Sequence, residues 1–165
     1  MKYRVPNGEA MRSLGRELAG VFTAGDLVIL SGGLGAGKTT LVQGIGAGLD
    51  VRGQVASPTF IISRVHEPTA GGPALVHVDA YRLGSLVELD HLDLDASADE
   101  AVTVVEWGEG KAEALAEGHA LITIHRPRGA LAEGEDAAAG ARTVTITTTG
   151  NAWNGRSWPA EGWTA

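Results

Sequence analysis

The feature that most constrains this sequence is the segment GGLGAGKT at residues 32–39, which satisfies the phosphate-binding pattern G-x-x-x-x-G-K-[ST]. A continuous apolar run at residues 27–30 precedes it, and a helical pattern follows over residues 38–49. Strand, glycine-rich turn and helix form the setting that this loop needs, because glycine backbones can turn successive N–H groups toward phosphate oxygens. The less favoured alternative is a glycine-rich turn that only joins a strand to a helix.

The residue types of the loop suit a nucleotide polyphosphate. The amino end of the following helix adds a partial positive charge. Lys38 supplies a compact cation for the β- and γ-phosphates, and the hydroxyl of Thr39 can bind Mg²⁺. The expected nucleotide-binding residues of the loop and the helix start are Gly33, Leu34, Gly35, Ala36, Gly37, Lys38, Thr39 and Thr40.

Two acidic residues stand where such a loop needs a group to hold metal or polarise water. Residues 74–79 and 101–106 both have the pattern of buried strands, the first ending in Asp79 and the second in Glu106. Ligands of parallel α/β sheets gather at the carboxyl ends of strands, so we expect these acids near the loop. Each acid alone could also be an ordinary surface carboxylate. His77 shares a strand face with Asp79, and it either borders the site or packs in the core.

Strands with apolar interiors that alternate with helical patterns predict an α/β three-layer sandwich, with a mostly parallel central sheet and flanking helices. One domain is expected over residues 1–149. Residues 129–140 have low complexity and are expected to form a loop. Residues 150–165 contain three tryptophans but no periodicity, and are expected to form a flexible tail.

Composition narrows the class of partner. Thirteen Lys and Arg against twenty Asp and Glu give a formal net charge of −7, which disfavours direct contact with DNA or RNA. The absence of cysteine excludes thiol catalysis and cysteine-bound zinc. The sequence contains no secretion signal and no apolar run long enough to span a bilayer, so a cytoplasmic location without membrane contact is expected.

Three further motifs accompany the loop: S-P-T-F at residues 57–60, H-V-D-A-Y-R-L at residues 77–83 and V-E-W at residues 105–107. Together with the loop they resemble the TsaE (YjeE) family, the small bacterial P-loop ATPases of tRNA threonylcarbamoyladenosine synthesis. The resemblance covers residues 11–148 or so and implies a P-loop NTPase-like fold.

The resemblance also implies roles for individual residues. Lys38 and Thr39 would bind ATP and Mg²⁺, and Glu106 would complete the metal site. Asp79 would act with Lys38 in catalysis by orienting the attacking water. Thr59 would lie in a switch-like loop near the γ-phosphate, and Glu109 would lie near the nucleotide.

Partners follow from the same resemblance. The ATPase would act with threonylcarbamoyl-transferase subunits and contact tRNA indirectly at most. Few arginines lie in the region that should surround the phosphates, so we expect slow ATP hydrolysis in isolation and a site completed by a partner.

Trp107 would wall the nucleotide pocket or pack in the core. Met11 stands where the family usually has a threonine that approaches the adenine.

Two other functions remain open at this point. A small-molecule P-loop kinase would use arginines such as Arg126, Arg128 and Arg142 to clamp phosphates, although the sequence shows no arginine-rich lid helix. A GTP-dependent switch would need the guanine-reading pattern N-K-x-D, and no lysine of this chain follows an asparagine. The sequence therefore favours an ATPase, with the kinase as the alternative.

Overall fold

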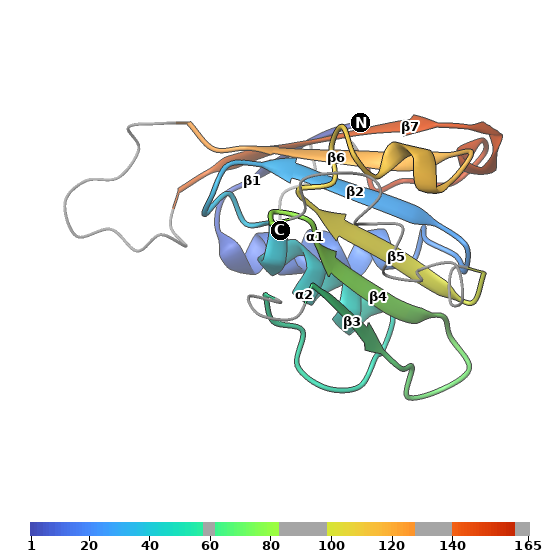
Figure 1. Ribbon diagram of the computed structural model, residues 1–165. Helices are drawn as coiled ribbons and strands as arrows, with labels where there is room; N and C mark the ends of the chain where they lie inside the picture. Colours follow the sequence, from blue (N-terminus) through green and yellow to red (C-terminus); the bar gives the residue numbers. More distant parts are fainter. Residues whose placement is uncertain (58–61, 83–98, 128–139, 161–165) are drawn as a thin grey trace.

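The computed structural model describes residues 1–57, 62–82, 99–127 and 140–160 (Figure 1). Among these residues seven strands form one mixed sheet in the order β1-β7-β6-β2-β5-β4-β3. The strands are β1 (Lys2–Val5), β2 (Leu27–Gly32), β3 (Ser63–His66), β4 (Ala74–Asp79), β5 (Ala101–Glu106), β6 (His119–His125) and β7 (Arg142–Thr149). The helices are α1 (Gly8–Ala19) and α2 (Lys38–Gly48), with short 3-10 turns η1 (Glu113–Leu115) and η2 (Asn151–Trp153).

The centre of the sheet is parallel and its edges are antiparallel. Strands β6, β2, β5 and β4 run in the same direction, whereas β7, β1 and β3 join by antiparallel pairing. The predicted parallel sheet is therefore confirmed for the centre that carries the phosphate-binding loop. Strand β1 was not predicted from the sequence, because four residues are too few for their alternation of exposed and buried positions to stand out.

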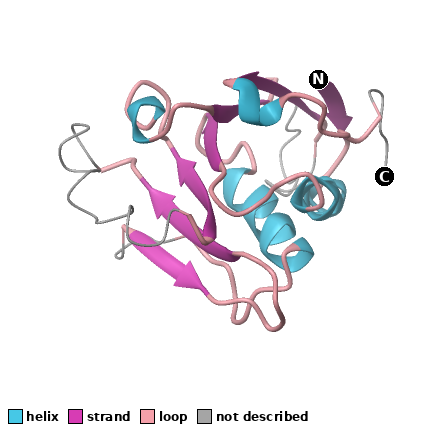
Figure 2. Cartoon of the chain, turned by 90° about the vertical axis from the view of Figure 1, so that its right-hand side faces the viewer, coloured by secondary structure: helices cyan, strands magenta, loops and turns pink. Residues whose placement is uncertain are grey.

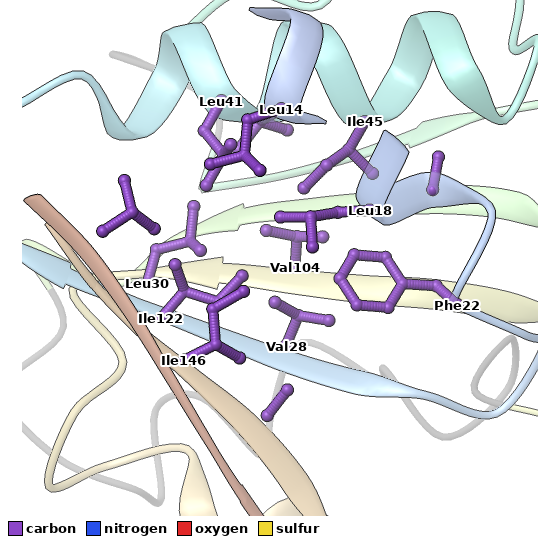
Figure 3. Packing of buried hydrophobic residues seen from close by; sticks show 14 of the residues in the cluster. Leu14, Leu18, Phe22, Val28, Leu30, Leu41, Ile45, Val104, Ile122 and Ile146 are labelled. Carbon is purple, nitrogen blue, oxygen red and sulfur yellow. The ribbon is translucent and has the colours of Figure 1, made fainter. Parts of the chain in front are cut away.

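Helices α1 and α2 lie on the same face of the sheet (Figures 1 and 2). Their apolar side chains pack with alternate residues of the central strands, as Leu14, Ile45 and Val28 do in Figure 3. The opposite strand face carries Leu27, Ile29 and Val105, and among the described residues it is covered by the segment around η1. Within the described ranges the second layer is represented there by one short turn, η1, and residues 83–98 lie outside these ranges.

The two helices cross with their backbones in direct contact. A Cβ atom on Gly44 would lie 2.2 Å from the carbonyl oxygen of Arg12, and one on Gly15 would lie 2.5 Å from the carbonyl oxygen of Leu41. No side chain fits at either position. The glycines inside α2, unfavourable for an isolated helix, are therefore explained by this close approach.

The carboxyl-terminal segment is packed against the domain as far as residue 160, which differs from the expected tail. Trp153 is buried, and Trp158 stacks on it with ring centroids 6.0 Å apart. Arg156 forms a two-bond ion pair with buried Asp26, with N–O distances of 2.5 and 2.9 Å. Aromatic burial and this ion pair hold a segment whose sequence has no periodic pattern.

No helix within the described ranges is long and apolar enough to cross a bilayer.

Candidate functional site

The glycine-rich loop joins the end of β2 to the start of α2 and depends on glycine backbones. Gly35 and Gly37 have φ angles of 72° and 110°, in the left-handed region that side chains disfavour. A Cβ on Gly32 would lie 2.6 Å from the carbonyl oxygen of Ile124. Leu34 stands at the tip of the loop with 94% of its surface exposed. The loop therefore has the tight, open-sided shape that its sequence predicts.

Lys38 lies inside this loop. Its ammonium donates hydrogen bonds to the carbonyl oxygens of Gly32 and Gly33, at 2.8 and 3.1 Å. The ring centroid of Trp107 lies 3.6 Å from the same nitrogen, a close cation–π contact. Burial lowers the pKa of Lys38, and the negative charges of Glu106 and Asp79 oppose this shift by a smaller amount.

Thr39 and Glu106 meet directly behind the loop. The hydroxyl of Thr39 donates to the Glu106 carboxylate, with distances of 3.0 Å to Oε1 and 3.3 Å to Oε2. The buried His77 reaches the same carboxylate, with Nε2 at 2.8 Å from Oε1. Thr39 from α2 and His77 from β4 thus both bind the Glu106 carboxylate at the end of β5. Thr39 and Glu106 are the two residues predicted as metal ligands.

Asp79 and Glu106 end two neighbouring parallel strands and are paired in register. This confirms the expectation that the two acids lie together at the carboxyl ends of their strands. Asp79 Oδ1 accepts a hydrogen bond from the backbone N–H of Tyr81 at 2.9 Å, which holds the carboxylate at the turn that leaves β4. The two acids have different environments, because Glu106 is buried and Asp79 is half-buried.

A pocket of about 560 Å³ opens beside the loop. Aromatic and charged side chains share its wall with the loop backbone, and the lining residues are Ser31, Gly32, Gly33, Tyr81, Trp107, Glu109 and Lys111. The rings of Tyr81 and Trp107 lie 5.0 Å apart, and Trp107 has a left-handed φ of 61°. Ser31 donates a hydrogen bond to Glu109. The structure therefore brings Glu109 to the loop and places Trp107 at the pocket wall.

Arg142, at the start of β7, is hydrogen-bonded to the loop. The sequence did not predict this supporting role. This β7 residue is buried, and its Nε donates to the carbonyl oxygen of Ala36 at 3.2 Å. Burial lowers the pKa of Arg142, and the positive charge of Arg126 adds to the shift. Met11 is also buried, with its terminal methyl 3.4 Å from where a Cβ on Gly37 would lie. Both residues are too distant in sequence for any local pattern to connect them with the loop.

Some predicted residues are not placed. Thr59 lies outside the described residues, whereas Ser57, which precedes it by two positions, is described and exposed. Thr40 is half-buried in the first turn of α2.

In the described part of the chain no three His, Cys, Asp or Glu side chains cluster as a complete metal site. Magnesium commonly binds through one or two carboxylates and keeps water and phosphate ligands, so a single glutamate and a hydroxyl suit that ion.

Comparisons with known proteins show the family of this chain. Residues 5–132 match the family model described as threonylcarbamoyl adenosine biosynthesis protein TsaE. The chain is 56% identical to the Streptomyces coelicolor tRNA threonylcarbamoyladenosine biosynthesis protein TsaE over 144 residues, 87% of this chain and 93% of the relative. It is 49% identical to the Mycobacterium bovis protein of the same description over 129 residues, 74% of this chain and 77% of the relative.

A solved structure also matches the whole fold. The crystal structure of Bacillus subtilis YdiB superposes with a TM-score of 0.69 at 29% identity, covering 93% of this chain and 88% of that one. The fold and the sequence similarity both indicate the same family. This chain belongs to the TsaE family of threonylcarbamoyl adenosine biosynthesis proteins.

Proposed function

We propose that this chain is the ATP-binding and ATP-hydrolysing component of tRNA threonylcarbamoyladenosine biosynthesis. In this proposal it acts with threonylcarbamoyl-transferring partner proteins and leaves contact with tRNA to them. One observation carries the proposal beyond the family name. The Thr39 hydroxyl at the start of α2 bonds the Glu106 carboxylate at the end of β5, immediately behind a glycine loop that holds Lys38.

The residues fit Mg²⁺ and a nucleotide polyphosphate. The loop would lose its shape with side chains, since a Cβ on Gly32 would meet the Ile124 carbonyl and Gly35 and Gly37 have left-handed backbones. A hydroxyl and a carboxylate are hard oxygen donors of the kind that Mg²⁺ prefers. Thr39 and Glu106 would therefore hold the ion.

Each residue has a distinct part in the proposed reaction. Bound Mg²⁺ would neutralise charge on the phosphates. Lys38 would exchange its two carbonyl acceptors for phosphate oxygens, and the adjoining Trp107 ring would limit access of water to its ammonium. Asp79 would orient the attacking water and accept its proton. Thr39 and Glu106 would fix the metal side of the site.

The arginines do not separate the two functions, because Arg126 lies beside the loop, with one guanidinium nitrogen 4.0 Å from where a Cβ on Gly35 would lie. Arg142 is buried and bonded to the Ala36 carbonyl at the base of the loop, so it serves as a support there. Arg128 lies outside the described residues. An arginine supplied by a neighbouring protein can raise the rate of phosphoryl transfer by about 10³–10⁵. We therefore propose that the isolated chain hydrolyses ATP slowly and is accelerated by its partners.

Binding of a fluorescent ATP analogue, followed by steady-state ATP turnover, tests the proposal. Lys38→Ala should abolish tight binding, because the loop loses its cation. Lys2→Ala on the distant strand β1 should bind like the wild type, and it controls for the loss of one positive charge. Turnover should rise when threonylcarbamoyl-transferring partners are added. Wild-type affinity in Lys38→Ala, or turnover of about 10 per second without partners, would contradict the proposal. A phosphorylated small-molecule product would indicate the kinase.

A further inference from the structure

His77 stands on β4 with none of its surface exposed, although it carries a polar ring. Its neighbours Val76 and Val78 point to the opposite face of the sheet and are buried in an apolar cluster. Nε2 of the ring is hydrogen-bonded to Oε1 of Glu106 at 2.8 Å. Nδ1 is buried and has no partner within the described part of the chain. Within the described residues the ring therefore hydrogen-bonds to the Glu106 carboxylate and to no other group.

The contact determines which ring nitrogen carries the hydrogen. Both carboxylate oxygens of ionised Glu106 can only accept hydrogen bonds, so Nε2 must be the donor. In a neutral ring Nδ1 is then an acceptor, and this buried atom has no hydrogen-bond partner among the described residues. A buried polar atom without a partner costs stability, and an apolar side chain at this position would avoid that cost. Packing alone therefore gives a poor account of histidine at residue 77.

The same hydrogen bond constrains the carboxylate. Oε1 accepts from both His77 and Thr39, whereas Oε2 has the longer contact with Thr39, at 3.3 Å. A glutamate side chain has three rotatable bonds, and a second donor from a rigid strand removes much of that freedom. Residues that hold metal-binding groups from behind act in this way and strongly affect metal affinity.

We propose that His77 is a positioning residue. Its Nε2–H holds the Glu106 carboxylate in the orientation in which Glu106 and Thr39 together bind Mg²⁺. This inference rests on the proposed function, because it assumes that Glu106 is a ligand of Mg²⁺. It extends that function by assigning a residue that does not itself touch nucleotide or metal.

Two substitutions at residue 77 separate positioning from packing. His77→Leu keeps a comparable volume and removes the donor. His77→Gln keeps an N–H donor near the place of Nε2. His66→Leu is the matched control, because His66 is a second buried histidine, on the neighbouring strand β3, whose Nδ1 lies 3.3 Å from the Arg52 carbonyl oxygen. Thermal unfolding measures the structural effect of each substitution.

The deciding measurement is a Mg²⁺ titration of ATP-analogue binding, with a parallel titration in chelator. His77→Leu should weaken the apparent Mg²⁺ affinity about 10–100-fold while metal-free nucleotide binding stays unchanged. His77→Gln should recover much of the loss, and His66→Leu should show none. If His77→Leu does not fold, His77→Gln and its titration decide alone: Mg²⁺ affinity within about threefold of wild type supports the inference, and a loss as large as that of Glu106→Gln overturns it.

Wild-type Mg²⁺ affinity in folded His77→Leu, or an equal loss in His66→Leu, would overturn the positioning role while leaving the proposed function intact. A nucleotide affinity of the wild type that is the same with and without Mg²⁺ would instead argue that Glu106 holds no Mg²⁺. That result would overturn both proposals, and it is read from the unmodified protein alone.

Discussion

The contact between α1 and α2 predicts an unusual outcome for a common stabilising substitution. Replacing glycine by alanine within a helix normally stabilises it by about 1 kcal/mol. At Gly44, however, the new Cβ would lie 2.2 Å from the Arg12 carbonyl oxygen, whereas ordinary contact requires 3.4 Å or more. The helices would have to separate by about 1 Å, which loosens contacts along their whole crossing. We therefore expect Gly44→Ala to destabilise the protein.

The magnitude follows from two opposed terms. Overpacking costs about 1–3 kcal/mol, and backbone atoms cannot move aside as a flexible side chain can, so the upper part of that range applies. After subtraction of the helix-propensity gain, the free energy of unfolding should fall by about 2 kcal/mol. For a chain of this size the melting temperature should fall by about 4–8 °C.

Chemical and thermal unfolding of the purified variant, followed by circular dichroism, measures this change. The matched control is Ala47→Gly, an exposed position of the same helix. It should cost about 1 kcal/mol through propensity alone. An unfolding free energy for Gly44→Ala equal to or above that of wild type would refute the close backbone contact.

The remaining predictions concern the site, the carboxyl-terminal segment and pH. Glu106→Gln should weaken the Mg²⁺ dependence of nucleotide binding, whereas Asp79→Asn should retain Mg²⁺-nucleotide binding and lose turnover; normal turnover in Asp79→Asn would contradict this division. Arg156→Leu should lower the free energy of unfolding by about 1–3 kcal/mol in urea titrations, because buried Asp26 loses its ion pair; an unchanged midpoint would argue against that pair. Burial lowers the pKa of His66 from 6.5, so the unfolded chain binds the proton more readily and stability should fall as pH drops below 6.5. His66→Leu should flatten that part of the profile, and an unaltered slope would count against the assignment.

The core of the site was predictable because it is local or periodic. The loop follows directly from its glycines and Lys38, and the two acids follow from strand alternation combined with parallel pairing. In parallel strands that end together, Asp79 and Glu106 must share an edge. These arguments need no knowledge of distant contacts.

What the sequence could not supply depends on long-range packing. Arg142 meets Ala36 across 106 positions, and the Trp153 ring finds its place only because the domain offers a hydrophobic surface beside Phe22. The link between His77 and Glu106 spans 29 positions and two strands. Strand alternation placed His77 on the correct face, but it could not show which side chain the ring would meet. The role expected of Thr59 stays a prediction.

The left-handed backbone at Trp107 has a consequence for how neighbouring residues are used. In an extended strand, successive side chains point to opposite faces, so residues 106 and 107 would be divided between the two sides of the sheet. The φ of 61° breaks that alternation directly after Glu106. The carboxylate and the indole then both act on the Lys38 ammonium, one through its charge and the other through its ring face. The left-handed backbone thus allows two residues adjacent in the sequence to act on the same ammonium group.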